Sequence, residues 1–305
     1  MTIPAVLVCD EGPGVGLGHR RRCEAVAAEL RTVGFSPAIV AAGRGVIAAP
    51  VVVVDSYRFR ADDRKHFVPD VVVAIDDLDR DLDVDILVLP APGVAMNLGE
   101  REAPQRLTRD RLQLAGAKFS LIDQAMCAVE SVPITDAVQR VFVTMGAADA
   151  AGIGADIAAD LAAGRGVGGG IDVRLVVGQW GSDTVPMGVT GVFGQRSLVD
   201  ELAHADIVVT AGGVTLLESL AMGRPTVVVP TAANQNANVA ACVAAGAAVE
   251  ANATSAATLA RALMYDTAHR ASIGAAGRLL IDGRGAQRVA ATLAERAAAM
   301  CGVAS

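Results

Sequence analysis

The sequence predicts an α/β fold made of two similar halves, each built around a buried parallel sheet. Three observations support this prediction. The chain has 305 residues, a length for which two domains are the usual expectation. Hydrophobic residues make up 52% of it and aromatic residues 3%, so its core must consist mainly of Ala, Val, Leu and Ile. Val-rich runs alternate with Ala-rich helical stretches in both halves, as they do where helices cover a parallel sheet.

The first half contains short apolar runs that end in acidic or Gly-rich segments. We interpret these runs as parallel strands that end at one edge of a sheet. They are Ala5–Asp10, Pro37–Ala41, Val51–Asp55, Val71–Asp76 and Asp85–Leu89. Residues 19–32, between the first two runs, carry apolar side chains at helical spacing. The strand–loop–helix–strand order is that of a Rossmann-like domain.

The second half repeats this alternation after a polar, Pro-containing segment at residues 130–137, where we expect the linker. Its predicted strands begin at Arg140, Val173, Asp206 and Thr226. Its predicted helices are Ile153–Ala163, Leu198–Ala203, Leu216–Met222 and Asn238–Ala245. We therefore expect an N-terminal Rossmann-like domain over 1–135, a second one over 138–285, and a final Ala-rich helix within 286–305 that can pack on either domain.

Composition excludes several functional classes. The net charge of −7 and the absence of a basic, aromatic-containing stripe argue against a nucleic-acid partner. The five cysteines are widely spaced and form no C-x-x-C pair, which predicts reduced thiols without a disulfide framework or a zinc site. No signal peptide or membrane span is predicted, because Pro and Asn residues interrupt the longest uncharged stretch. We expect a cytoplasmic protein without a metal, and its oligomeric state stays open.

A Gly-rich loop separates the first predicted strand from the first helix. It contains Gly16 and Gly18 and leads directly into His19. Glycines let the backbone approach a ligand closely, and a helix N-terminus favours an anion. Dinucleotide-binding proteins share this pattern, but the second predicted strand ends in Ala-Ala-Gly-Arg (41–44), without the acidic residue that would bind the ribose of NAD. We therefore expect no NAD and no other cofactor.

His19 is the candidate catalytic base. It is predicted at the carboxyl edge of the sheet, where open α/β domains bind ligands, and an imidazole can accept a proton near neutral pH. The structural alternative, a capping or core histidine, is more common for a lone histidine. The next strand ends favour catalysis, because Asp55, Tyr57 and Asp76 are expected at the same edge.

A second constellation follows a strand of the second half. There Gly212 and Gly213 lead into a helix whose free N–H groups can hold a diphosphate without a metal, and the Thr215 hydroxyl adds a donor. Glu218 lies about one turn further and can accept hydrogen bonds from ribose hydroxyls, although a solvated helix residue is the alternative. Asn234 and Gln235 follow the next strand and offer amides for sugar hydroxyl or acetamido groups.

These motifs together resemble a known family. They are Gly-Leu-Gly-His-x-x-Arg-Cys at Gly16–Cys23, Asp55-Ser56-Tyr57, Ile75-Asp76-Asp77, Met145-Gly146-Ala147-Ala148-Asp149, the Gly212–Glu218 segment and Asn234-Gln235. Their order is similar to that in the UDP-sugar hydrolases of pseudaminic-acid biosynthesis, which are related to the peptidoglycan N-acetylglucosaminyltransferase. The resemblance implies the GT-B fold, in which two Rossmann-like domains with parallel sheets face each other across a cleft.

The resemblance also implies roles for individual residues. His19 would activate water, which attacks the anomeric carbon and expels UDP with inversion, and Asp55 and Tyr57 would lie in the same catalytic site. The implied substrate-binding residues are Gly16, Gly18, Arg22, Asp76, Gly146, Gly212, Gly213, Val214, Thr215, Glu218, Asn234 and Gln235. In the second half, Trp180 and Arg196 are possible neighbours of the nucleobase, although packing or surface roles are more common for such residues.

We therefore expect a metal-independent hydrolase that cleaves a nucleoside-diphosphate-sugar, most simply a UDP-linked amino or acetamido sugar, at its anomeric C–O bond. One alternative is an inverting GT-B glycosyltransferase, in which His19 deprotonates an acceptor hydroxyl instead of water. A second alternative is a protein that binds a nucleotide-sugar without turning it over, in which His19 is structural. A UDP-sugar is the expected partner in all three cases.

Overall fold

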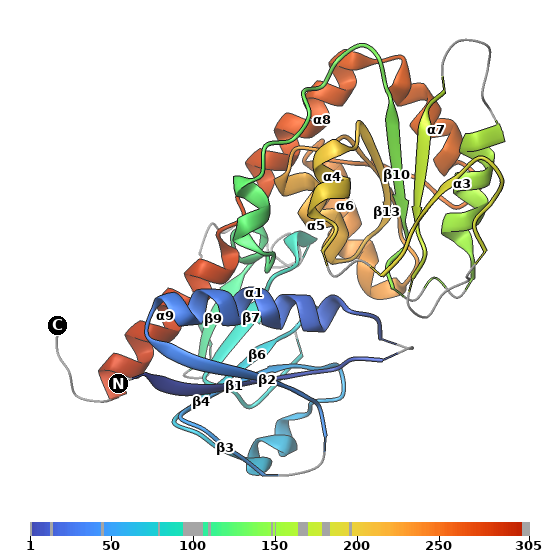
Figure 1. Ribbon diagram of the computed structural model, residues 1–305. Coiled ribbons are helices and arrows are strands. Elements are labelled where there is room, and N and C mark those ends of the chain that lie inside the picture. Colours follow the sequence, from blue (N-terminus) through green and yellow to red (C-terminus); the bar gives the residue numbers. More distant parts are fainter. Residues whose placement is uncertain are drawn as a thin grey trace. The chain divides into compact units, whose positions relative to one another are not determined.

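The computed structural model describes residues 2–12, 15–43, 46–78, 80–93, 106–108, 111–147, 149, 151–163, 170–178, 184–194 and 197–300. The chain folds into two compact units (Figure 1). The first unit contains the first strand, Leu17–Gln124 and the C-terminal segment from Gly283. The second unit is built from Ala125–Asp282. The segment expected as the linker, residues 130–137, thus belongs to the second unit.

The first unit is built on a sheet of seven strands among the described residues. In spatial order these are β2 (Phe35–Ala41), β1 (Ile3–Cys9), β4 (Val51–Asp55), β6 (Val71–Ile75), β7 (Ile86–Leu89), β9 (Arg111–Ala115) and β8 (Arg106–Thr108). All neighbours pair in parallel except β8, which runs antiparallel to β9. Two short strands, β3 (Ile47–Ala48) and β5 (Phe67–Val68), form a separate parallel pair.

Helices α1 (Gly18–Thr32) and α9 (Gly285–Met300) pack together on one face of this sheet (Figure 1). Their small residues, such as Ala27 and Ala290, are fully buried against the strands, which lets both helices lie close to the sheet. Apolar residues that include Phe59 and Leu82 cover the other face. Because both faces are covered, every residue of β4 and β6 is buried, in agreement with their Val-rich sequences. Short 3-10 helices at Ala61–His66 and Ala117–Phe119 complete the unit.

The second unit is built on a fully parallel sheet of six described strands. Their spatial order is β12 (Thr190–Val192), β11 (Asp172–Val176), β10 (Arg140–Thr144), β13 (Ile207–Ala211), β14 (Thr226–Val229) and β15 (Val249–Glu250). The described helices of this unit are α3 (Ile153–Ala163), α4 (Val199–His204), α5 (Val214–Ala221), α6 (Asn236–Ala244), α7 (Ala256–Met264) and α8 (Thr267–Leu280). Short 3-10 helices occur at Gln124–Ala128, where the two units divide, and at Ala233–Gln235.

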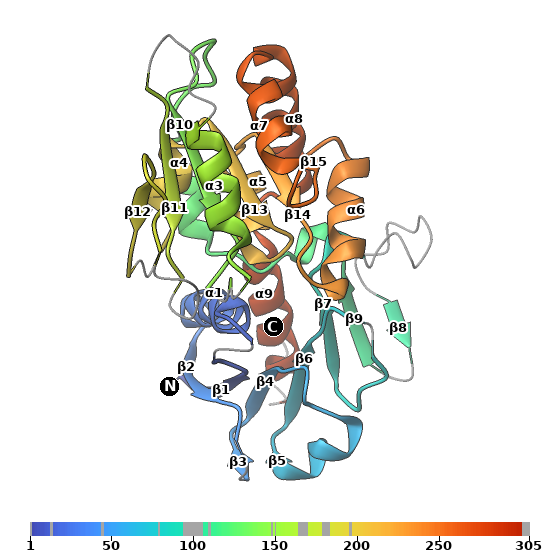
Figure 2. The same ribbon diagram turned by 90° about the vertical axis from the view of Figure 1, so that its right-hand side faces the viewer.

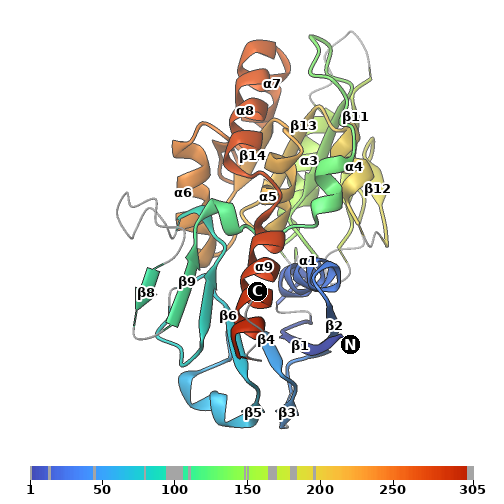
Figure 3. The ribbon, with the colours of Figure 1, turned by 90° about the vertical axis from the view of Figure 1, so that its left-hand side faces the viewer.

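Helices cover both faces of the second sheet as well. Residues of α3 and α7 pack on one face and residues of α4 on the other, so that α3 is nearer the viewer in Figure 2 and α4 in Figure 3. Helix α8 closely approaches α5 and the turn that follows it at two glycines. A Cβ atom on Gly274 would lie 2.5 Å from the carbonyl oxygen of Gly223, and one on Gly277 would lie 2.9 Å from that of Leu220.

The structure confirms the predicted α/β class and places strands or helices at each of the predicted segments. The final helix, whose packing the sequence left open, belongs to the first unit and contacts α1. Among the described residues, none of the helices combines the length and apolarity that a membrane span requires.

Candidate active site

His19 lies in the first turn of α1 and is only 4% exposed. The Asp55 side chain projects from the last residue of β4, and β4 is the parallel neighbour of β1, whose end leads into the Gly-rich loop. The carboxyl ends of these adjacent strands therefore bring together two residues that are far apart in the sequence. Gly16, within the loop, has a φ of 79°, a conformation that glycine adopts without strain.

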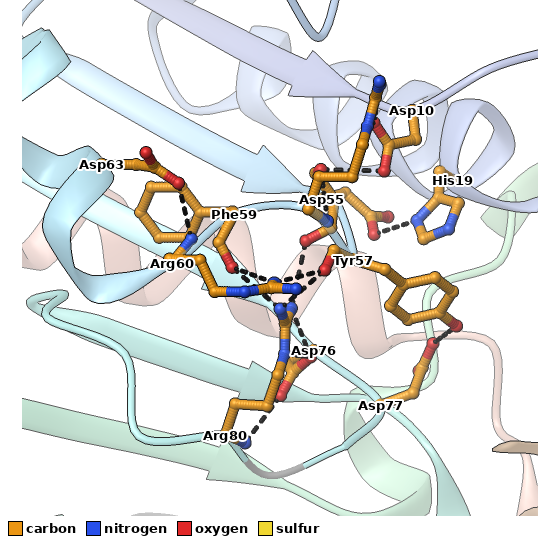
Figure 4. A network of polar contacts seen from close by, with 12 residues as sticks. Asp10, His19, Asp55, Tyr57, Phe59, Arg60, Asp63, Asp76, Asp77 and Arg80 are labelled. Atoms are coloured by element: carbon orange, nitrogen blue, oxygen red, sulfur yellow. Dashed lines mark hydrogen bonds and ion pairs between the residues drawn. The ribbon is translucent and has the colours of Figure 1, made fainter.

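The imidazole of His19 contacts the Asp55 carboxylate directly. Nδ1 lies 2.5 Å from Asp55 Oδ1, and Figure 4 shows the ring directed at this carboxylate. Nδ1 also lies 3.0 Å from Nη2 of Arg22, but it cannot accept from that cation while it donates its own proton to Asp55. The shorter contact to an anion assigns the Nδ1 proton to the Asp55 bond. Nε2 is then the basic nitrogen of the ring.

Arg22 holds Asp55 from the other side. Its Nε donates to Asp55 Oδ2 at 2.8 Å and its Nη2 to Oδ1 at 2.7 Å, while Nη1 donates to both oxygens of Asp77 at 2.7 Å. Burial acts to lower the pKa of Arg22, but the charges of Asp55 and Asp77 outweigh burial and raise that pKa well above its usual value. Arg22, expected to bind substrate, is in this structure engaged by two carboxylates.

Tyr57 and Asp77 complete the surroundings of His19. The Tyr57 ring meets the His19 ring edge to face at a centroid distance of 4.6 Å, and its hydroxyl donates to Asp77 Oδ2 at 2.7 Å (Figure 4). Burial acts to raise the pKa of Asp77, whereas the charge of Arg22 and the hydrogen bonds from Arg22 and Tyr57 lower it. The net effect lowers the pKa of Asp77, so this carboxyl group is ionised at neutral pH.

Asp76, the residue expected at this edge, has a different environment. It is fully buried and accepts a hydrogen bond from Nε of Arg80 at 2.9 Å. Arg80 also donates to the backbone carbonyls of Ser56, Tyr57 and Phe59, and so ties the loop that follows β4 to the end of β6. In this structure Asp77 rather than Asp76 joins the cluster around His19. The sequence placed the Ile75-Asp76-Asp77 motif at this edge but favoured Asp76 as the site residue, and successive side chains of an extended chain point to opposite sides, so only one of the two can face His19.

Asp10 is held in a similar way at the end of β1. It accepts hydrogen bonds from the Ser56 hydroxyl at 2.8 Å and from Nε of Arg58 at 3.0 Å. Burial acts to raise the pKa of Asp10, but the bonds from Arg58 and Ser56 outweigh burial and lower it. The carboxyl edge of the first sheet thus carries several fixed anions close to one basic imidazole nitrogen.

In the second unit, Gly212 and Gly213 connect β13 to α5 as expected. Gly213 is the N-cap residue of α5 and has no side chain to bond the free N–H groups of the first turn. Thr215 lies in that turn and is half-buried, and Glu218, one turn further, is 5% exposed. The turn therefore presents backbone donors, and the positive end of the helix dipole, to an anion.

Two amide side chains hold the Gly212 peptide in place. Gln235 Oε1 accepts from the N–H of Gly212 at 3.2 Å and from that of Thr231 at 2.8 Å, and Asn238 Nδ2 donates to the Gly212 carbonyl at 3.2 Å. A Cβ atom on Gly212 would lie 2.6 Å from Cγ2 of Val239, so any larger residue here would force its neighbours to shift. Because the Gln235 oxygen already accepts two N–H groups, the group that Gln235 can offer a ligand is its Nε2 donor. Sequence reasoning did not single out Asn238.

The remaining expected site residues are more dispersed. Asn234 is exposed in the 3-10 helix before α6. Gly146 follows β10 with a φ of 88°, and Asp149, from the same motif, accepts hydrogen bonds from the N–H groups of Ile153 and Gly154 at the start of α3. Asp149 therefore caps α3, and its carboxylate bonds N–H groups of the first turn that could otherwise bind an anion. Trp180 and Arg196 lie outside the described residues.

A cavity of about 410 Å³ opens at the carboxyl ends of β14 and β15. It is lined by residues that include Ile153, Pro230, Asn252 and Ser255, and none of the expected site residues lies in its wall. Across the described part of the chain, no group of three or more His, Cys, Asp or Glu side chains is arranged to hold a metal ion.

Comparison with known proteins agrees with this architecture. Residues 188–273 match the glycosyltransferase family 28 C-terminal domain. The fold is similar to that of the glycosyltransferase SnogD from Streptomyces nogalater, with 16% identity, a TM-score of 0.58, and coverage of 97% of this chain and 100% of that one. Among curated proteins, none shows a significant sequence match.

Two further solved structures have the same fold. The spinosyn forosaminyltransferase SpnP is 12% identical with a TM-score of 0.64, and the match covers 98% of this chain and 100% of that one. MurG from Acinetobacter baumannii is 12% identical with a TM-score of 0.60, and the match covers 96% of this chain and 99% of that one. The chain therefore has the GT-B fold of glycosyltransferases, and its second unit carries the match to a glycosyltransferase C-terminal domain, which together support an enzyme.

Proposed function

We propose that this protein transfers the sugar of a nucleoside-diphosphate-sugar to an acceptor hydroxyl with inversion, and that His19 is the catalytic base. The observation that carries the proposal is the buried contact between His19 Nδ1 and Asp55 Oδ1. A carboxylate on Nδ1 fixes the ring and stabilises the imidazolium that forms when Nε2 accepts a proton.

The proposed reaction is a single displacement. The acceptor O–H gives its proton to Nε2 of His19 while its oxygen forms a bond to the anomeric carbon. The bond between that carbon and the diphosphate oxygen breaks, and the nucleoside diphosphate leaves with the electron pair. Arg22 donates to both oxygens of Asp55, so two charge-assisted hydrogen bonds hold this side chain in place during the reaction.

The second unit would hold the leaving group. The N–H groups at the start of α5, next to Gly213, can stabilise the negative charge that grows on the departing diphosphate. Thr215 would add a hydroxyl donor, Gln235 and Asn234 would add amide groups, and Glu218 would accept from the ribose hydroxyls. We propose a UDP-sugar as the donor, without a metal ion, on the basis of the resemblance of these segments to those of UDP-sugar enzymes.

The family match favours transfer over hydrolysis, because the domain over residues 188–273 is named for glycosyltransferases. Hydrolysis remains the second candidate. The Gly16–Cys23 motif favours it, since that segment resembles the hydrolases of pseudaminic-acid biosynthesis. Both reactions use the same base, and they differ in whether His19 deprotonates water or an acceptor hydroxyl.

A single experiment separates these candidates. The purified protein is incubated with a panel of UDP-, GDP- and dTDP-sugars, first alone and then with small-molecule and glycan acceptors, and release of the nucleoside diphosphate is measured. Transfer predicts turnover only when an acceptor is present, with inverted configuration in the product. Rapid release of free sugar without an acceptor would establish the hydrolase instead. Tight UDP binding without turnover under any of these conditions would reject both reactions, and loss of turnover with excess chelator would reject the metal-free site.

A further inference from the structure

Charged side chains at the carboxyl edge of the first sheet follow a regular pattern with one exception. Three buried carboxylates each pair with a different arginine, and these pairs are Asp10 with Arg58, Asp55 with Arg22, and Asp76 with Arg80. Asp77 is a fourth carboxylate, and it shares Arg22 with Asp55. With His19 neutral, this group of side chains has four negative and three positive charges.

We propose that Asp77 is a positioning residue for the reaction, whose surplus negative charge stabilises His19 when it becomes protonated. This inference rests on the proposed role of His19 as the base. Asp77 contacts His19 only through other groups: Arg22 lies between them on one side, and the Tyr57 ring, which packs on His19, donates its hydroxyl to Asp77 on the other.

The charge balance gives the physical reason. When His19 accepts a proton, the net charge of the cluster changes from −1 to zero, so that its positive and negative charges are then equal in number. Without the Asp77 charge, the same step would take the cluster from zero to +1. Both His19 and Asp55 are almost completely buried, so solvent screens this difference weakly. The lowered pKa of Asp77 keeps its charge in place over the pH range in which an imidazole titrates.

Other ionisable groups also face His19, and they must be considered together. They are Arg22 on α1, Asp10 at the end of β1, Asp55 at the end of β4, Tyr57 in the loop after β4, and Asp77 after β6. Asp10 is neutralised by Arg58, and Asp55 by Arg22. Removal of the Asp77 charge therefore changes the charge around His19 and leaves both the Arg22–Asp55 fork and the Asp10–Arg58 pair in place.

The test uses the full chain with Asp77→Asn, which keeps the shape of the side chain and removes its charge. The titration of the His19 imidazole is followed by NMR, with the signal assigned by its loss in His19→Gln. We expect its midpoint to move to lower pH by about one unit, a shift that corresponds to about 1.4 kcal/mol. Asp83→Asn is the matched control, since it removes an exposed carboxylate from the same segment and should leave the midpoint unchanged.

Two further variants keep the test decisive. Asp77→Glu retains the charge and should leave the midpoint close to that of the wild type. Asp77→Ser removes the charge with a smaller side chain and should reproduce the shift if the Asn variant does not fold. An unchanged midpoint in a folded, charge-removing variant, or an equal shift in Asp83→Asn, would overturn the proposal.

Kinetics provide a second readout that a purely structural role would not produce. In Asp77→Asn the acidic limb of the pH–rate profile should move to lower pH, and kcat on the plateau should fall about 10-fold because a weaker base accepts the proton. The affinity for UDP should be unchanged, since its proposed site is in the second unit. If the wild type turns over no nucleotide-sugar, the proposed function fails, whereas the NMR titration still decides the electrostatic role of Asp77.

Discussion

Replacing Asp55 with Asn tests the proposed catalytic dyad at its most buried member. The Asp55 carboxylate is fully buried and accepts from His19 Nδ1 and from Nε and Nη2 of Arg22. An Asn side chain has nearly the same shape but offers one oxygen and one NH₂ group. The NH₂ group must face either the arginine or the Nδ1 proton, so a donor then opposes a donor.

The two consequences have different magnitudes. Leaving a buried charge partly unpaired costs about 3–5 kcal/mol, and we expect the lower end because Arg22 keeps its bonds to Asp77. The reaction loses the group that fixes the His19 tautomer and stabilises its protonated form, which typically lowers kcat by about 10³- to 10⁴-fold. This loss corresponds to about 4–5.5 kcal/mol in the barrier.

The assay must separate stability from catalysis. We would measure thermal unfolding, UDP affinity by calorimetry, and kcat with a donor and acceptor that support turnover in the panel described above, below the unfolding temperature of the variant. Asp70→Asn, an exposed carboxylate of the same unit, is the control and should behave as the wild type. A folded Asp55→Asn protein with kcat within about 10-fold of the wild type would refute the dyad. Such a result would mean that proton transfer to His19 does not need the Asp55 carboxylate.

The remaining predictions concern the donor site and the stability of the first unit. Gly212→Ala should lower the free energy of unfolding by about 1–3 kcal/mol, because its Cβ would lie 2.6 Å from Cγ2 of Val239. Urea unfolding measures this change, and an unchanged midpoint would contradict the close contact between Gly212 and Val239. Gln235→Glu retains an oxygen for the Gly212 N–H but adds a negative charge, so UDP affinity should fall about 10-fold or more while uridine affinity stays the same in calorimetry. The folded-state pKa of Asp10 is lowered, so its contribution to stability is present above its unfolded pKa of about 3.9 and is lost as the pH falls through the folded value. Wild type should therefore lose more unfolding free energy than Asp10→Asn between about pH 5 and pH 2, and parallel curves would argue against this contribution.

The alternation of Val-rich and Ala-rich segments was enough to predict most of the fold. Parallel strands that are buried on both faces need continuous runs of apolar residues, and such runs are easily recognised in a sequence. Several of the elements that escaped prediction lack this signal, whereas helix α7 carries it and was still not predicted. Strand β15 has two residues, and β12 has Gly191 at its centre. Helix α8 contains Gly274 and Gly277, which lower helix propensity but are required where α8 meets α5. Packing between elements, which local sequence does not report, fixes these segments.

For the candidate site, the sequence predicted which residues lie at the ends of the strands, but not which of them contact one another. Parallel topology places His19 and Asp55 at one edge, but the choice between Asp76 and Asp77 depends on how the chain turns after β6 and on which arginine reaches each carboxylate. Whether Gln235 offers a ligand its oxygen or its NH₂ group likewise depends on its bonds to two backbone N–H groups that are distant in sequence from each other. Sequence identifies residues capable of the chemistry, whereas their hydrogen-bond partners decide what each one can donate or accept.

The most direct test of the central claim is the turnover of His19→Gln, measured beside its affinity for UDP. Glutamine can keep a hydrogen bond to Asp55 but has no basic nitrogen, so it removes the base with little change to the packing. We predict that turnover falls by at least about 10²-fold and that UDP affinity stays at the wild-type value, while His66→Gln, at an exposed site of the same unit, remains fully active. Wild-type turnover in a folded His19→Gln protein would contradict the assignment of the base.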